Sequence, residues 1–356
     1  MSYGALMKPI RTFAALVACA ELAAGPALAQ APAAPVPEPA PAAQPAVGGE
    51  AGIDDPNQVS ELVVVAHPQG PPIWRVTYNG AEMTIVGSVT PMQQQQRWDR
   101  RQTMAALEGA RLVILPPTVG LNPVQVLALV TANVWRVRTL GDLESRLSPE
   151  LRARFVAARE AARQPASRYA HWKPAVAGQL LLSDSRRTFG YSMGKPGTTI
   201  AKIAKGMNIP SRVISHYSMN SLVGVAIKLD DQQNLTCLDD ALTQAKYELD
   251  HAQDMNDDWA RGNVLAVNAR YRVQPIQRCL MLVPGARKEI ERAMAEAADR
   301  LWAELQKPGK TVAVMDMAWL LPKDGLLDRL KAHGATVGEP PQVASAEKAE
   351  GDTEKD

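Results

Sequence analysis

Two short motifs in the 356-residue sequence have the residue types of a ligand site, but neither is complete. Residues 194–199 (GKPGTT) contain the Gly-Lys pair of a phosphate-binding loop; the loop's first glycine is missing, and a proline follows the lysine. Residues 254–258 (DMNDD) resemble the start of a calcium loop. Trp259 replaces the turn glycine and Leu265 the bidentate glutamate, so we expect neither nucleotide nor calcium binding there.

Other catalytic patterns are also missing from the sequence. Residues 178–185 contain no nucleophile-elbow sequence of the G-x-S-x-G type. No C-x-x-C motif and no paired Cys/His spacing occurs, so a structural zinc site is not expected. His67, His171, His251 and His333 occur singly in segments that we interpret as loops or polar helix faces, where solvated side chains are expected.

The N-terminus has the features of an export signal over residues 1–29. Lys8 and Arg11 precede an apolar stretch, and residues 27–29 (ALA) form a small-x-small cleavage site. A second interpretation is a lipobox at residues 16–19 (LVAC), in which case Cys19 would carry a lipid anchor. A third is an uncleaved anchor. All three predict a protein outside the cytoplasm, periplasmic or held at the membrane as a lipoprotein.

Cleavage after residue 29 leaves Cys237 and Cys279 as the two cysteines of the mature chain. Because an exported protein folds in an oxidising compartment, we expect a disulfide between them. The alternative is two buried free thiols.

The composition indicates one sizeable α/β domain between two polar ends. Lys and Arg total 39 against 37 Asp and Glu, and this near balance disfavours a nucleic-acid-binding protein. Residues 30–57 begin with an Ala/Pro-rich stretch that predicts a linker, and residues 338–356 predict a disordered tail. The folded domain is therefore expected at 58–337.

Strand patterns near both ends of this domain and helix patterns in its middle predict an α/β fold with a mixed β-sheet core, flanking helices and a helical middle insertion. Asn79-Gly80 predicts a tight hairpin between the second and third strands. Strands are expected at 62–66, 73–78, 82–87, 111–115, 211–215, 311–317 and 335–337, and helices at 93–109, 122–137, 149–163, 173–187, 198–207, 238–270, 284–306 and 324–333.

Five groups of segments, in order between about residues 71 and 337, carry a resemblance to a known family. They are 72–76 with 82–90, 104–115, 140–143 with 147–151, 172–174, and 308–314 with 319–330 and 334–337. Together they resemble the TraB/GumN family, which includes the Tiki metalloproteases and the pheromone-inhibitor proteins. The resemblance implies a divalent-metal hydrolase site made of two G-x-x-H histidines and a glutamate after a strand.

At the metal-ligand positions this sequence departs from the family pattern. The first G-x-x-H reads Gly87 to Thr90, and the glutamate position falls on Pro116. The second reads Asp316 to Trp319, with Asp in place of Gly and Trp in place of His. These five residues are expected to form a vestigial site without metal, in which the Trp319 ring fills the metal's place.

The leading hypothesis is an exported, catalytically degenerate family member that binds or scaffolds an envelope protein or peptide, with no cofactor. The first alternative is an active metal-dependent peptidase that uses His216 and Asp316 as displaced ligands. The second is a plain periplasmic interaction domain.

Overall fold

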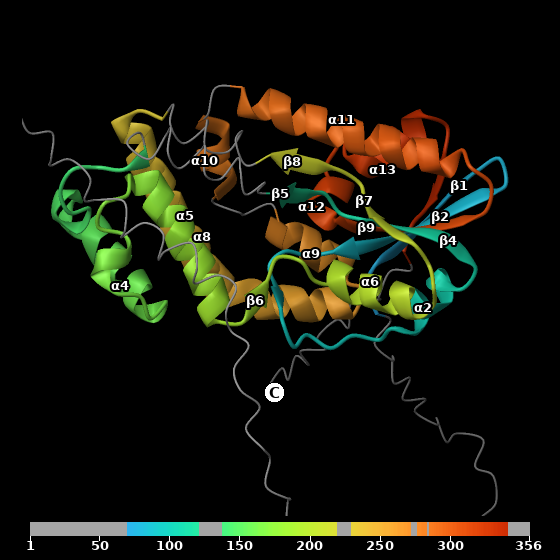
Figure 1. Ribbon diagram of the computed structural model, residues 1–356, viewed down its shortest axis with the longest axis horizontal. Coiled ribbons are helices and arrows are strands. Elements are labelled where there is room, and N and C mark those ends of the chain that lie inside the picture. The colour runs from blue at the N-terminus through green and yellow to red at the C-terminus, as the bar shows by residue number, and fades with distance from the viewer. Residues whose placement is uncertain (1–69, 121–136, 219–228, 272–275, 283–284, 341–356) are drawn as a thin grey trace, which may run out of the picture. The chain divides into compact units, whose positions relative to one another are not determined.

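The computed structural model describes residues 70–120, 137–218, 229–271, 276–282 and 285–340 (Figure 1). The predicted signal peptide, linker and first strand, nearly all of the helix expected at 122–137, and the tail beyond residue 340 lie outside these ranges. Within the described ranges, no helix is long and apolar enough to cross a membrane.

The centre of the fold is a mixed six-stranded sheet with the order β10-β1-β2-β9-β4-β7 (Figure 1). The sequence predicts the mixed sheet but not the order of its strands. Strands β2, β9, β4 and β7 are parallel to one another, whereas β1 is antiparallel to both β2 and β10. The strands are β1 (Ile73–Tyr78), β2 (Ala81–Ser88), β4 (Ala110–Leu115), β7 (Ser211–Val213), β9 (Lys310–Asp316) and β10 (Thr336–Gly338). Two short pairs lie apart from this sheet, β3 (Met92–Gln93) with β6 (Tyr191–Ser192) and β5 (Thr118–Gly120) with β8 (His216–Ser218).

The hairpin between β1 and β2 confirms the turn prediction. Asn79 and Gly80 have φ angles of 46° and 80°, and Tyr78 pairs with Ala81 across the turn. Positive φ at both central residues is what a type I′ turn requires, and asparagine and glycine adopt it most readily.

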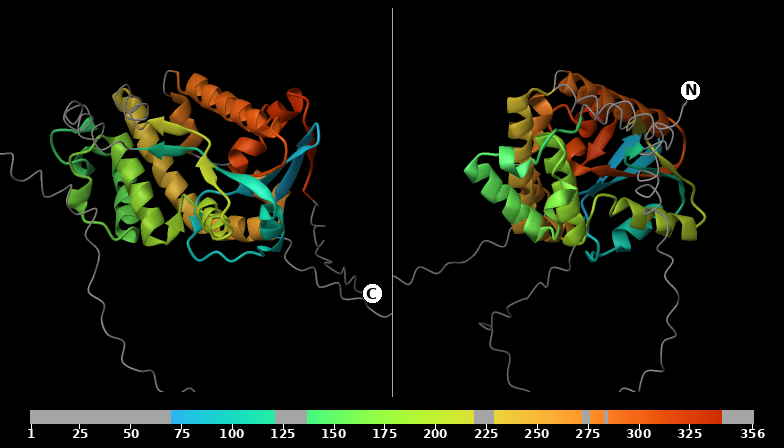
Figure 2. Two further views of the ribbon diagram at one scale, coloured as in Figure 1. Left: turned by 45° about the vertical axis from the view of Figure 1, so that its right-hand side comes forward. Right: turned by 60° about the vertical axis from the view of Figure 1, so that its left-hand side comes forward.

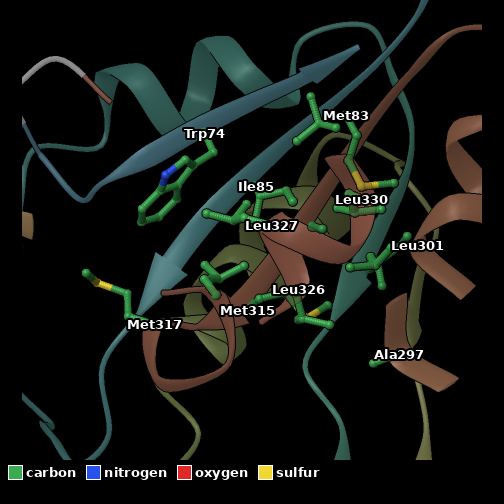
Figure 3. Close-up of a cluster of buried hydrophobic side chains, with 14 of the residues drawn as sticks. Trp74, Met83, Ile85, Ala297, Leu301, Met315, Met317, Leu326, Leu327 and Leu330 are labelled. Atoms are coloured by element: carbon green, nitrogen blue, oxygen red, sulfur yellow. The ribbon is translucent and has the colours of Figure 1, made fainter. Parts of the chain in front are cut away.

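Helices cover both faces of the sheet because the buried side chains of each strand alternate. On β9, Val312 and Val314 pack with α2 (Arg101–Leu107) and α6 (Gly197–Gly206). Ala313 and Met315 belong to the core on the opposite face, with α11 (Ala286–Leu305) and α13 (Leu326–Ala332). Figure 3 shows this second core, where Met83 and Ile85 of the hairpin lie beside Leu330 and Leu327 of α13, and Trp74 lies on the side of Met317.

The middle of the chain forms the predicted helical insertion, which lies beside the sheet (Figure 2). It consists of α4 (Pro149–Ala161), α5 (Pro174–Thr188), α10 (Ile276–Leu282) and most of α8 (Asp231–Ala260), with the 3-10 turns Glu144–Arg146 and Ala166–Arg168. Phe155, Leu181 and Leu238 are in its core. A disulfide between Cys237 and Cys279 joins α8 to α10, with an S–S distance of 2.07 Å, as predicted.

Two helix predictions were wrong in extent. The stretch 93–109 is helical over Arg101–Leu107 alone, because Met92–Gln93 pairs with β6 and Trp98 packs against the core from the segment between the strand and the helix. The helix expected at 238–270 begins earlier, at Asp231, behind a capping box formed by Asp230 and Gln233. It breaks at Gly262, whose φ is 77°, and continues as α9 (Val264–Tyr271).

Candidate functional site

The carboxyl ends of three parallel strands bring the predicted site residues to one edge of the sheet. Ser88, the last residue of β2, pairs with Asp316, the last residue of β9. Thr90 follows β2 and Pro116 follows β4 on the other side of β9. Ligands of open α/β sheets bind outside such strand ends, so this edge is the first place to look for a site.

A cavity of about 410 Å³ opens at this edge. Four of the five predicted site residues line it: Thr90, Pro116, Asp316 and Trp319. The remaining lining residues are Ser88, Pro117, Arg186, Met193, Gly194, Lys195, Gly197, Tyr271, Met315 and Ala318. The sheet, the insertion helix α5 and the loop before α6 therefore all contribute to one cavity.

The Asp316 carboxylate is held by three hydrogen bonds. The Thr90 hydroxyl donates to Oδ2 at 2.5 Å, and the Tyr271 hydroxyl donates to Oδ1 at 3.2 Å. The backbone N–H of Ala318 donates to Oδ1 at 2.8 Å, which makes Asp316 the N-cap of the short helix α12 (Met317–Leu320). The Thr90 N–H in turn donates to the Tyr271 oxygen at 3.2 Å. Both carboxylate oxygens are thus engaged within the protein.

Burial changes the acidity of this group and of its neighbour. It raises the pKa of Asp316 above the ordinary value, although the bonds from Thr90, Ala318 and Tyr271 act in the opposite direction. Burial first, and the Asp316 charge second, raise the pKa of Tyr271 well above its usual range. Tyr271 therefore stays a neutral hydrogen-bond donor at ordinary pH.

Gly87, the fifth predicted residue, is buried in β2 and does not line the cavity. A Cβ there would lie 2.7 Å from Cζ3 of Trp74 and 3.0 Å from Cγ of Met317. The Gly87 carbonyl accepts a hydrogen bond from the Trp259 indole at 2.7 Å. Close packing beside the cavity explains why residue 87 is a glycine.

The side chains of the cavity do not fit a divalent metal. Among the described residues, Asp316 is the one carboxylate in its lining and no histidine lies there, while Arg186 and Lys195 add positive charge. Metal sites of hydrolases instead converge several imidazole and carboxylate ligands. Across the described residues, no group of three or more His, Cys, Asp and Glu side chains is placed to hold a metal ion.

His216 lies at a different place from Asp316. It is exposed on β8, and its Nδ1 lies 2.9 Å from the Thr118 hydroxyl of the paired strand β5. It does not belong to the residues that line the cavity. The structure therefore does not bring the two proposed displaced ligands together there.

Apart from Ser88 at the end of β2, three polar residues of the cavity were not predicted from the sequence. Tyr271 ends α9, Arg186 lies on α5, and Lys195 precedes α6. For Lys195 a signal existed, since it belongs to the incomplete phosphate-loop motif of residues 194–199. Nothing local in the sequence marks Arg186 or Tyr271, because their position depends on how the insertion packs against the strand ends.

A comparison with models of protein families gives a match over most of the described part of the chain. The model of the TraB/PrgY/gumN family matches residues 72–339, which begins just before β1 and ends just after β10. Comparisons with curated proteins and with solved structures gave no match. The matched range covers well over half of the chain and includes every residue that lines the cavity. The chain belongs to the TraB/PrgY/gumN family.

Proposed function

We propose that this chain is an exported envelope protein that acts by binding a ligand in the strand-end cavity, and that it is a pseudoenzyme. The carrying observation is the state of Asp316, whose two oxygens are already used by Thr90, Tyr271 and Ala318. These bonds occupy most of the acceptor positions of the carboxylate, and no imidazole or second carboxylate among the described residues of the cavity lining completes a metal site with it.

The identities of the other cavity residues support the same proposal. Thr90, Pro116 and Trp319 occupy the positions where the family resemblance places histidine, glutamate and histidine, and all three line the cavity. Proline has no side-chain donor atom, and the indole of tryptophan donates a hydrogen bond but does not accept one. The side chains at these three positions therefore offer no imidazole or carboxylate to a metal ion.

Export is supported by two features of different kinds. Residues 1–29 have the charge, apolar stretch and cleavage motif of a signal peptide. The Cys237–Cys279 disulfide is of the kind that persists in oxidising compartments. A periplasmic location follows from these features, with a lipid anchor at Cys19 as the alternative mode of retention.

The rival proposal, a metal-dependent peptidase, requires His216 and Asp316 to act together. The contact of His216 with Thr118 on the β5–β8 pair gives it a structural role at another place. The proposal of a plain interaction domain has no need of a cavity at the strand ends. The lining of that cavity, which mixes charged and apolar side chains, favours ligand binding there.

The test measures metal and activity on one preparation of the exported, mature protein. The protein is dialysed against manganese, cobalt and zinc in turn, and bound metal is determined by elemental analysis. Hydrolysis of a mixed peptide library is followed by mass spectrometry, with a family member that has intact G-x-x-H motifs as the positive control. We expect no stoichiometric metal and no hydrolysis, and the same result for His216→Ala. Stoichiometric metal that is lost in Asp316→Ala would overturn the proposal.

A further inference from the structure

The charge of the strand-end cavity is unusual for a site derived from a metal centre. Of the residues that the structure describes, two basic side chains, Arg186 and Lys195, line it with a single acidic one, Asp316, while Glu248 forms an ion pair with Arg186 from outside the lining. The Asp316 carboxylate accepts hydrogen bonds from the hydroxyls of Thr90 and Tyr271. A divalent cation is disfavoured by this arrangement, and a negatively charged group is favoured.

Arg186 is held in place by a buried partner and keeps donors free. Its Nε donates to Oε2 of Glu248 at 2.7 Å, and its Nη2 donates to Oε1. Glu248 is 5% exposed and also accepts from Gln244, so the carboxylate is itself fixed. Within the described residues, Nη1 of Arg186 has no hydrogen-bond partner, which leaves its two N–H groups for a ligand.

Lys195 supplies the second positive charge from a different element. Its ammonium donates to the Gln94 carbonyl, and an ammonium has two further N–H groups. Gly197, the first residue of α6, also lines the cavity, and no side chain caps this helix. The positive end of the α6 dipole therefore adds to the field of the two side chains.

Apolar side chains form a large part of the remaining lining. Trp319, Pro116 and Pro117 line the cavity, and so does Met193, whose side chain is exposed to 54%. Exposed apolar side chains in a concave site give binding energy to the uncharged part of a ligand.

We propose that the cavity binds an oxyanion, a carboxylate or a phosphate, attached to an apolar body, with the anion at Arg186 and Lys195 and the body against Trp319. The proposal rests on the proposed function, because a metal in the cavity would occupy the same space. Asp316 opposes the anion through its charge, so the anion belongs on the side of the cavity away from it. Replacing Asp316 by Asn is then expected to strengthen binding.

The test is isothermal titration calorimetry on the mature exported chain at low salt with four probes. These are N-acetylphenylalanine, its uncharged amide, phenyl phosphate and inorganic phosphate. We expect N-acetylphenylalanine to bind at least about tenfold tighter than its amide, because the amide lacks the charge-assisted hydrogen bonds. Comparing it with phenyl phosphate decides between carboxylate and phosphate. Phenyl phosphate is expected to bind tighter than inorganic phosphate because of its ring.

Two variants test whether the anion binds at Lys195 and Arg186. Lys195→Gln is expected to weaken binding of the preferred anionic probe about tenfold while leaving the amide unchanged. Lys202→Gln is the matched control, since Lys202 is an exposed lysine of α6 that does not line this cavity. Arg186→Lys keeps a cation opposite Glu248 but loses the fork, so we expect weaker anion binding in a folded protein. Circular dichroism verifies that each variant is folded.

The possible results separate this proposal from the proposed function. Equal affinity for the acid and its amide, or no binding of any probe, overturns the anion proposal even when metal and hydrolysis are absent. An unchanged affinity in both Lys195→Gln and Arg186→Lys also overturns it. Stoichiometric metal with peptide hydrolysis overturns the proposed function itself, whatever the probes do.

Discussion

Gly87 offers the sharpest test of the packing beside the cavity. In Gly87→Ala, the added Cβ meets Cζ3 of Trp74 at 2.7 Å and Cγ of Met317 at 3.0 Å. Trp74 is fully buried, so its ring has no free space to move into. Overpacking of this kind costs about 1–3 kcal/mol, and alanine returns about 0.4–1 kcal/mol by restricting the unfolded chain. We expect a net loss of about 1–2 kcal/mol.

The assay is urea unfolding followed by circular dichroism, with a double-mutant cycle that includes Trp74→Phe. Phenylalanine lacks the indole atoms that the new methyl group meets, so the cost of Gly87→Ala should fall in that background to the part that the contact with Met317 causes. The coupling energy is then expected to be about 1 kcal/mol or more, well above the scatter of independent sites. Gly206→Ala is the control, because a Cβ there has no atom within 4 Å and its φ is not positive.

The reasoning is refuted if Gly87→Ala is as stable as the native protein. It is also refuted if the two changes at Gly87 and Trp74 are additive, since the clash with the indole ring would then not be the cause. In either case another explanation would be needed for glycine at this position of β2, such as a requirement of the site.

Three further predictions concern the disulfide, the stability of the protein at low pH and the hydrogen bonds of Asp316. Replacing Cys237 and Cys279 together by alanine removes a link across a sequence separation of 42 residues. By the chain-entropy estimate this lowers the free energy of unfolding by about 4 kcal/mol. Urea titration measures this free energy, and a loss under about 1 kcal/mol would contradict the prediction. Glu304 is buried, which acts to raise its pKa, but hydrogen bonds from Lys307, Arg212 and Arg111 lower that pKa to about 2. Its stabilising contribution of about 2–3 kcal/mol is therefore complete above pH 4.5 and lost as the pH falls towards 2; Glu304→Gln should flatten this part of the stability curve, and an unchanged slope would exclude the effect. Asp316→Ala leaves the Thr90 and Tyr271 hydroxyls without their acceptor and removes the N-cap of α12. The free energy of unfolding, measured by thermal unfolding, should therefore fall by about 2–3 kcal/mol. An unaltered melting temperature would show that these hydrogen bonds do not stabilise the protein.

Local signals in the sequence were sufficient where the physics is local. Asn79-Gly80 predicts the hairpin because the turn requires positive φ at both residues, and the structure has it. Ser148 followed by Pro149 predicts the start of α4, and the Ser148 side chain accepts from the Leu151 N–H at 3.3 Å. Where the expected helix at 93–109 was too long, no local signal opposed it, because the pairing of β3 with β6 is a contact between residues far apart in sequence.

The candidate site could be predicted in part for the same reason. Thr90, Pro116 and Asp316 follow or end parallel strands, and parallel strands deliver their carboxyl ends to one edge. Their convergence therefore follows from strand assignment and direction. Tyr271 and Arg186 arrive from helices of other parts of the chain, and no spacing in the sequence places them beside Asp316.

By itself, the sequence predicted the family, the class of fold, the hairpin and the Cys237–Cys279 disulfide. It also placed Thr90, Pro116 and Trp319 where the resemblance implies metal ligands. Each depends on residue identity or on short-range periodicity, which a linear sequence carries. The tertiary structure alone decided that Asp316 is engaged by Thr90 and Tyr271, and that Arg186 and Lys195 give the cavity positive charge. Hydrogen bonding and electrostatic potential depend on distances between segments, and those distances exist only after the insertion has packed against the ends of the strands.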